Sequence, residues 1–233
     1  MALILSLDSS VSGCSVALHR DGILLGTEGD FSERSAARSL AVLCSELLLR
    51  LDVQPASLDA VAVAEGPGSY TGLRIASSTA KGLCFALDIP LIAVNSLLAL
   101  AEQVRNKGLE EGWTSRYHFY APMFDARRME VYTMVLDEKF RVVMPVRALV
   151  LDDQVFTPYL GQGDVLFFGN GATKVAGVST SPRVNILDGI EPSAADMGRL
   201  AWEAFTEKRF ESVDLFEPRY LKEFMIGRKP VSN

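Results

Sequence analysis

The feature that most constrains this chain is a glycine-rich turn between two apolar segments. Residues 66–74 read GPGSYTGLR, and the apolar run at residues 58–64 is typical of a buried strand. A second apolar run follows at residues 89–94, after a segment of small side chains that ends near residue 87. The pattern predicts a strand, a tight turn, a helix and another strand. We expect such a turn to lie close to a nucleotide or to another protein.

Further elements are predicted on both sides of this unit. The Asp21-Gly22 pair is a strong hairpin signal, so the chain is expected to open with an antiparallel meander. Asn95-Ser96 is a predicted N-cap for the helix that begins at residue 97. A polar, glycine-bearing segment at residues 106–115 indicates a boundary. We therefore predict a first lobe over residues 1–105 and a second over residues 106–233, and leave open that the C-terminal segment packs back on the first. The other predicted strands and helices lie at residues 3–7, 11–18, 23–28, 35–51, 97–104, 117–124, 130–136, 140–145, 165–168, 172–176 and 192–205.

Composition argues against several classes of protein. A hydrophobic content of 48% and a charged content of 22% are those of an ordinary globular chain. The formal net charge of -6 argues against a self-sufficient nucleic-acid binder, because phosphate contacts need clustered Lys and Arg, but it is compatible with serving RNA through a basic partner. No basic region precedes the first apolar run, and no apolar run approaches the roughly 20 residues that span a bilayer. We expect a cytoplasmic protein without membrane contact.

The glycine turn does not match the common nucleotide-binding motifs. A Walker A loop needs a lysine directly after its last glycine, whereas Gly72 is followed by Leu73 and the nearest lysine is Lys81. The three glycines miss the dinucleotide-binding spacing by one residue, and Pro67 removes a backbone N–H that a phosphate cradle would use. One anion at the N-terminus of the following helix stays open.

The helix after the turn carries small side chains at spacings of four. Gly72, Ala76 and Ala80 fall on one face, which lets another helix come close. Packing inside the lobe and contact with a partner protein are interpretations of equal weight. The leucine stripe of the predicted helix at residues 35–51 is a candidate extension of the same surface.

Two acidic turns are candidates for contact with phosphate or magnesium. Asp8, Ser9 and Ser10 follow the first predicted strand. An Asx turn that caps the hairpin is the favoured interpretation, and a phosphate-facing turn is the other. Asp125 follows a strand of the second lobe, where a surface ion pair is favoured over a catalytic role.

Histidine and cysteine are too sparse for a metal site. The two histidines are far apart, and we expect an exposed strand end for His19 and a half-buried position for His118. Cys14, Cys44 and Cys84 have no chelating spacing and are predicted to be buried, reduced thiols. We therefore dismiss a metallopeptidase and assign neither a catalytic residue nor a metal ligand.

The order of these motifs resembles the bacterial TsaB family, also called YeaZ. The resemblance covers nearly the whole chain, and its glycine-turn motif is highly specific. One departure is Arg38-Ser39, where many members keep a His-Ser pair near the start of the helix. The matching segments are LSLDSS at residues 5–10, CSVAL at 14–18, LDAVAV at 58–63, GPGSYTGLRI at 66–75, AKGL at 80–83, DAR at 125–127, EVY at 130–132, GNG at 169–171 and EPRYL at 217–221.

The resemblance implies an α/β fold of the actin, Hsp70 and sugar-kinase type, with two related lobes that are each a mixed sheet flanked by helices. It implies a non-catalytic partner subunit in the synthesis of N6-threonylcarbamoyladenosine (t6A) at position 37 of tRNA, which binds and supports the catalytic subunit TsaD. The ATPase TsaE joins them, tRNA is reached through the complex, and family members alone form homodimers. No cofactor is implied, although a nucleotide at a partner interface stays open. The alternative is an actin-like ATPase or phosphotransferase that uses Asp8 and Asp125.

The resemblance also implies where partners bind. Family members use largely the same first-lobe helices for the homodimer and for TsaD, and the sequence does not decide which helix face is exposed. In the same comparison the two acidic turns become vestigial nucleotide-facing turns, at Asp8, Ser9, Ser10 and Asp125. The candidate interface residues are Gly72, Ala76, Ala80, Leu83, Leu40, Leu43 and Leu47.

Overall fold

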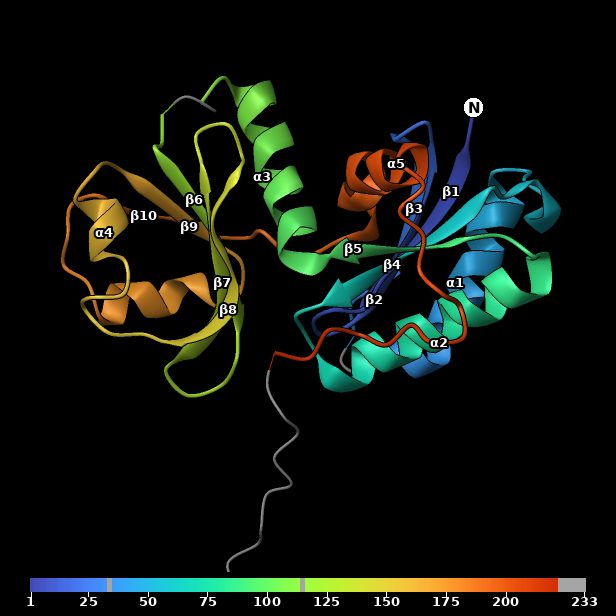
Figure 1. The fold of residues 1–233 in the computed structure, drawn as a ribbon, viewed down its shortest axis with the longest axis horizontal. Coiled ribbons are helices and arrows are strands. Elements are labelled where there is room, and N and C mark those ends of the chain that lie inside the picture. The colour runs from blue at the N-terminus through green and yellow to red at the C-terminus, as the bar shows by residue number, and fades with distance from the viewer. Residues whose placement is uncertain (33–34, 114–115, 222–233) are drawn as a thin grey trace, which may run out of the picture.

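The computed structural model describes residues 1–32, 35–113 and 116–221. Two five-stranded sheets lie side by side, with the long helix α3 (Ser96–Glu111) between them (Figure 1). The strand orders are β3-β2-β1-β4-β5 and β10-β9-β6-β7-β8. Each sheet combines parallel and antiparallel pairs, as predicted.

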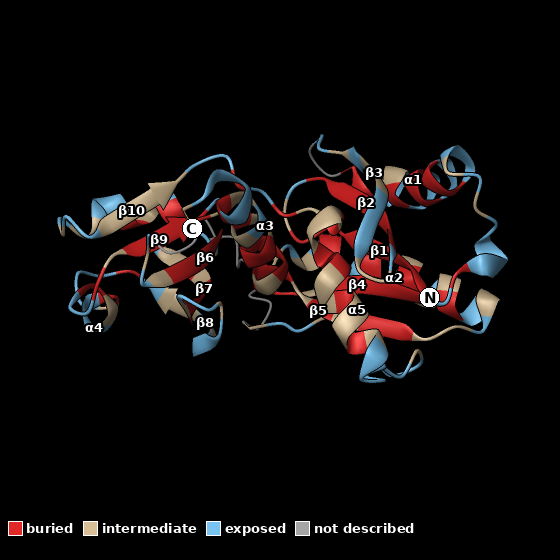
Figure 2. Cartoon of the chain, turned by 90° about the horizontal axis from the view of Figure 1, so that it is seen from above, coloured by how far each residue is buried: buried red, intermediate tan, exposed pale blue. Residues whose placement is uncertain are grey.

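The first sheet is buried on both faces. Side chains of β1 alternate between two cores, because successive residues of a strand point to opposite faces. Helices α1 (Ala36–Arg50) and α2 (Tyr70–Leu87) cover one face, and α5 (Gly198–Thr206) with the short η3 (Ala194–Met197) covers the other (Figure 2). The predicted three-strand meander is confirmed. The strands are β1 (Leu3–Asp8), β2 (Cys14–Arg20), β3 (Ile23–Asp30), β4 (Ala60–Gly66) and β5 (Leu91–Asn95), and η1 (Pro55–Ser57) precedes β4.

The second sheet repeats the connectivity of the first. In each, three antiparallel strands are followed by two that run parallel to the first of the three. This shared topology makes the two lobes related, as the resemblance implied. Strand β10 was not predicted, because its four residues are half-buried and show no alternation. The elements are β6 (Phe119–Asp125), β7 (Glu130–Asp137), β8 (Val142–Val150), α4 (Thr157–Leu160), β9 (Val165–Phe168), η2 (Ala172–Gly177) and β10 (Val184–Leu187).

The polar segment expected to separate the lobes is mostly helical. Helix α3 begins at its predicted cap, where the side chain of Asn95 accepts two backbone N–H groups at 3.1 and 3.2 Å. It continues through the buried Gly108 and ends at Gly112, which has a left-handed φ of 76°. Leu97, Leu100 and Val104 of α3 pack with residues of the second sheet, and the helix continues after its sequence turns polar. We propose the two lobes as the units of the fold; the division expected at residue 105 falls within α3.

After α5 the chain runs back across α2 (Figure 1). We call residues 211–221 the strap. The N–H of Glu211 donates to the carbonyl of Leu91 at 2.9 Å, and the N–H of Arg219 donates to the carbonyl of Glu65 at 2.7 Å. Between these points Phe216 is buried in the core beneath α1 and α2. The strap is therefore an integral part of the first lobe.

The glycine turn packs on the first acidic turn of the same chain. A Cβ at Gly68 would collide with the backbone of Ser10, and one at Gly72 would collide with the carbonyl oxygen of Ser9. The N–H of Ser69 donates to the carbonyl of Ser10 at 2.6 Å, and its hydroxyl caps α2 by accepting from the N–H of Gly72 at 3.3 Å. Two glycines of the motif are thus required by a backbone-to-backbone contact within the first lobe.

Because of this contact, replacing two different glycines of α2 by alanine should change stability in opposite directions. Gly72→Ala should lower the free energy of unfolding by about 2–3 kcal/mol, because the new methyl group overpacks a backbone contact. Gly82 lies on the same helix, and a Cβ at this position would have open space within 4 Å, so Gly82→Ala should raise the free energy of unfolding by about 0.5–1 kcal/mol. Chemical denaturation of both variants measures the difference. Equal effects at the two positions would contradict the contact.

Candidate functional site

The first acidic turn lies in the interior, beneath the glycine turn. Asp8, Ser9 and Ser10 are each 1–2% exposed. One oxygen of Asp8, Oδ1, accepts the N–H of Ser10 at 2.7 Å, while Asp8 Oδ2 and Ser10 Oγ are buried and make no hydrogen bond to the described residues. Burial raises the pKa of Asp8, and the hydrogen bond from the backbone N–H of Ser10 opposes the rise. The cavity at this turn measures about 10 Å³, the space of one water molecule. A phosphate group does not fit there in this conformation.

The second acidic turn lies at the surface of the other lobe. Asp125 forms an ion pair with Lys174 of η2 at 2.6 Å and accepts the N–H of Arg127 at 2.5 Å. Partial burial acts to raise the pKa of Asp125, but the bonds from Lys174 and Arg127 outweigh it and the pKa is lowered. Asp125 thus has a surface ion pair, although its partner comes from 49 residues further along the chain.

The exposure of the two histidines is the reverse of what the sequence predicted. His19 is only 1% exposed: Ser6 Oγ donates to its Nδ1 at 3.2 Å, and its Nε2 donates to the carbonyl of Ala195 at 3.0 Å. Burial lowers the pKa of His19, with the bond to Ala195 opposing. His118 is exposed just before β6. Local patterns missed the burial of His19 because its cover comes from η3, 176 residues away.

The cysteines are buried free thiols, as predicted. Burial raises the pKa of Cys44 to about 12 and that of Cys84 to about 11. Within residues 1–32, 35–113 and 116–221, no group of three or more His, Cys, Asp or Glu side chains is placed to hold a metal ion. Over the same residues, none of the helices has the length and apolar character needed to cross a bilayer.

Most of the expected interface residues are inside the first lobe. The face of α2 with small side chains packs toward α1 and the sheet, which is the close approach that its spacing indicated. Of the seven candidates only Leu83 is partly exposed. In this conformation six of the seven side chains are not accessible at the surface, and their role as interface residues stays a prediction. The buried candidates are Gly72, Ala76, Ala80, Leu40, Leu43 and Leu47.

The accessible side of the helix pair carries an apolar groove. Its volume is about 380 Å³, and it lies between the second half of α1 and the middle of α2. Leu49 at its rim is 82% exposed, and Val42 on the same helix is 51% exposed. Large apolar side chains that stay exposed together mark interaction sites. The groove is lined by Ala41, Cys44, Ser45, Leu48, Leu49, Asp52, Val53, Gln54, Pro55, Leu58, Thr79 and Leu83.

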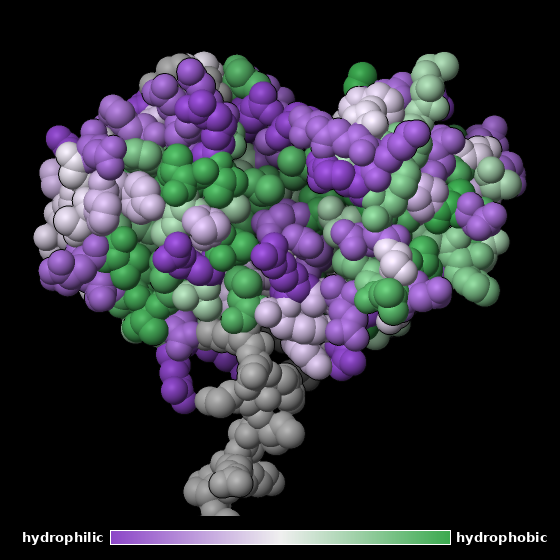
Figure 3. Space-filling model, viewed as in Figure 1, coloured by the Kyte–Doolittle hydropathy of each residue, from purple (hydrophilic) through white to green (hydrophobic). Residues whose placement is uncertain are grey.

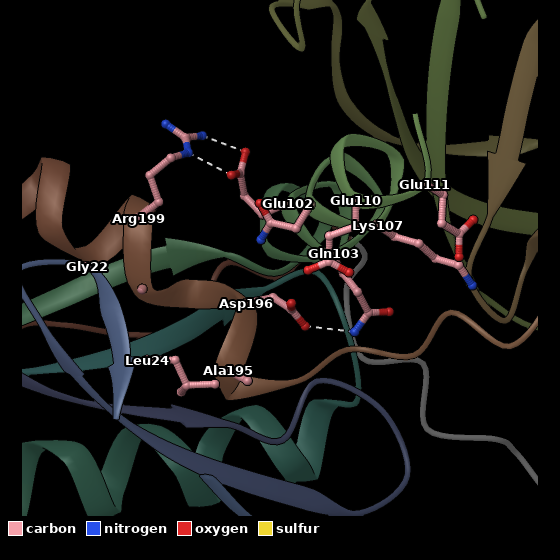
Figure 4. Close-up of a pocket in the computed structure, with 12 residues that line it drawn as sticks. Gly22, Leu24, Glu102, Gln103, Lys107, Glu110, Glu111, Ala195, Asp196 and Arg199 are labelled. Atoms are coloured by element: carbon pink, nitrogen blue, oxygen red, sulfur yellow. Dashed lines mark hydrogen bonds and ion pairs between the residues drawn. The ribbon is translucent and has the colours of Figure 1, made fainter. Parts of the chain in front are cut away.

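A polar cavity of about 590 Å³ lies where α3 meets η3, α5 and the β2–β3 hairpin (Figure 4). Buried Glu102 accepts two bonds from Arg199, at 2.5 and 2.6 Å, and Gln103 Nε2 donates to Asp196 Oδ2 at 2.7 Å. Burial raises the pKa of Asp196 to about 6, with the bond from Gln103 opposing and the charges of Asp8 and Glu102 adding to the rise. Sequence reasoning missed this cluster because its members come from segments 93 and 97 residues apart.

Asp196 makes stability depend on pH. The pKa of Asp196 is about 6 in the folded chain, which is above the ordinary 3.8. The contribution of Asp196 to the free energy of unfolding is therefore fully present below about pH 4 and is lost as the pH rises through about 6. When the pH is raised from about 4 to about 8, the free energy of unfolding of Asp196→Asn should increase by about 2–3 kcal/mol relative to that of the wild type. Denaturation at both pH values measures this, with exposed Asp188→Asn as control. A pH-independent difference between variant and wild type would contradict it.

Comparisons with known proteins cover both lobes. The family "tRNA N6-adenosine threonylcarbamoyltransferase" (TsaD) matches residues 30–174. The tRNA threonylcarbamoyladenosine biosynthesis protein TsaB of Bacillus subtilis is 33% identical over 171 residues, 72% of this chain and 70% of that protein. Its Escherichia coli namesake is 27% identical over 97% of both chains. The structure of YeaZ from Pseudomonas aeruginosa has a TM-score of 0.81 at 30% identity, over 95% of this chain and 100% of that one.

Proposed function

The chain belongs to the TsaB (YeaZ) family, with its two-lobed, actin- and sugar-kinase-like α/β fold, and on this premise we propose that it is a non-catalytic subunit in tRNA t6A synthesis. Its role is to bind and support a TsaD-type catalytic subunit. The observation that carries the proposal is the closed turn at Asp8, where about 10 Å³ is left for a ligand. A non-catalytic role is also compatible with the described residues, which contain no group of three or more His, Cys, Asp or Glu placed to hold a metal ion.

The alternative is an actin-like ATPase or phosphotransferase that uses Asp8 and Asp125. It is disfavoured because Asp8 is buried under the glycine turn and Asp125 is paired with Lys174. Titration calorimetry of the isolated chain with ATP and Mg²⁺ separates the two functions. We expect no binding heat and no phosphate release. Tight binding with turnover would establish the alternative.

The proposal also assigns the partners. A TsaD-type subunit binds the accessible side of α1 and α2 at the apolar groove, and the same surface forms a homodimer when that subunit is absent. A TsaE-type ATPase joins the assembly. tRNA is reached through the complex, since the net charge of -6 disfavours direct phosphate contacts. In this proposal the chain needs no cofactor of its own, and a nucleotide at the partner interface is compatible with it. The chain acts in the cytoplasm without membrane contact.

Reconstitution tests this function. With purified TsaD-type and TsaE-type subunits, tRNA and threonylcarbamoyl adenylate, t6A should form with this chain and fall to background when it is omitted. Leu49→Glu should lower t6A formation about tenfold or more, because a carboxylate is placed in the apolar contact. The matched control is Leu109→Glu on α3, where the leucine is 61% exposed and lies outside the groove.

Two outcomes contradict the proposal. Full t6A formation without the chain would remove its supporting role. Equal activity of Leu49→Glu and Leu109→Glu would move the partner to another surface.

Charged substitutions at Ala76 or Ala80 are not suitable tests of the interface, because both side chains are buried inside the lobe and such variants would unfold it.

A further inference from the structure

A second exposed surface lies on the flank of α2 that faces away from the groove. Helix periodicity of 3.6 residues places Thr79 and Leu83 on the groove side and Lys81 on the opposite side. The ammonium group of Lys81 donates to the carbonyl of Asp214 at 3.1 Å and to that of Phe216 at 3.2 Å. Lys81 thus fixes the strap along this flank.

The contact with Lys81 brings two large apolar side chains to the same flank. Phe85 lies one turn after Lys81 and is 82% exposed. Leu215 lies between the two strap residues that Lys81 binds and is 81% exposed. Phe216, the next residue, is buried and anchors the strap beneath them. The apolar pair is therefore held on a fixed support, and neither side chain is needed to fill the core.

Carboxylates lie on the strap on both sides of Leu215. Glu211, Asp214 and Glu217 of the strap are all exposed. Beside Leu215 a hollow of about 500 Å³ is lined by Glu65, Glu211 and Glu217, and Arg219 adds a cation to the lining. In the region of α2 and the strap, Figure 3 shows hydrophobic residues next to hydrophilic ones at the surface. The four carboxylates Glu65, Glu211, Asp214 and Glu217 outnumber the two cations of this surface, Lys81 and Arg219, so its charge balance is acidic.

We propose that Phe85, Leu215 and the strap carboxylates form a second docking surface, for a protein segment that carries an apolar side chain between basic ones. Charge complementarity carries the assignment, because an acidic surface attracts Lys and Arg and repels nucleic-acid phosphates. The surface is separate from the α1–α2 groove, so the chain can hold two proteins at once. The inference rests on the proposed function for its two binding probes, the TsaD-type and TsaE-type subunits.

Binding measurements with the two purified subunits test this surface. The double variant Leu215→Ser/Glu217→Lys should bind one of them about tenfold more weakly than wild type does, with the other unchanged. Rising salt should weaken the wild-type contact and reduce its advantage over the variant, since the strap carboxylates are exposed. The control is Leu109→Ser/Glu138→Lys, with the same changes at exposed positions on α3 and the β7–β8 turn. Circular dichroism and a thermal melt confirm that both variants fold.

The outcomes separate this inference from the proposed function. If Leu215→Ser/Glu217→Lys binds both subunits as wild type does at low salt, the second surface is overturned. If in that case Leu49→Glu still loses a partner, the proposed function stands. If neither variant loses a partner, both proposals fall. A concentration-dependent dimer that only the strap variant abolishes in light scattering would also overturn the inference, because a second copy would then be the occupant.

Discussion

The contact between the glycine turn and the Asp8–Ser10 turn is the interaction on which the rest of the first lobe depends. Gly68 and Gly72 let the two backbones meet, and the N–H of Ser69 closes the contact on Ser10. Because α2 begins at this point, the contact fixes where its small-residue face meets α1 and the sheet. It also covers Asp8 and leaves about 10 Å³ beside it. One contact thus organises the fold and closes the turn at Asp8.

The two lobes share a topology but not their helices. The sheets follow the same order of antiparallel and parallel strands. The first sheet carries helices of 15 and 18 residues on one face, whereas the corresponding coverage in the second lobe comes from α4 and η2, of four and six residues. The helix pair that exposes Val42, Leu49 and Phe85 therefore covers the first sheet, which is why the proposed partner is placed there.

Local sequence patterns predicted most of the elements, because alternation, capping and hairpin signals act over a few residues. The N-cap at Asn95 and the meander of the first three strands are examples. The same patterns failed for features that depend on contacts with residues distant in the sequence. His19 is covered by η3, and Asp196 is paired across the lobes with Gln103. The turn at Asp8 was identified as a candidate, but its burial under residues 66–72 follows from a tertiary contact.

Helix α2 shows why spacing alone left its role undecided. Small residues at a spacing of four indicate close packing but do not say what packs there. The structure divides the circumference of α2 between different neighbours: the small residues face the core, Thr79 and Leu83 face the groove, and Lys81 holds the strap. Small side chains suit the core-facing side because α1 and the sheet approach it closely. The proposed partner surfaces therefore lie on the sides of α2 where large apolar groups remain exposed, which are the sides that the core leaves uncovered.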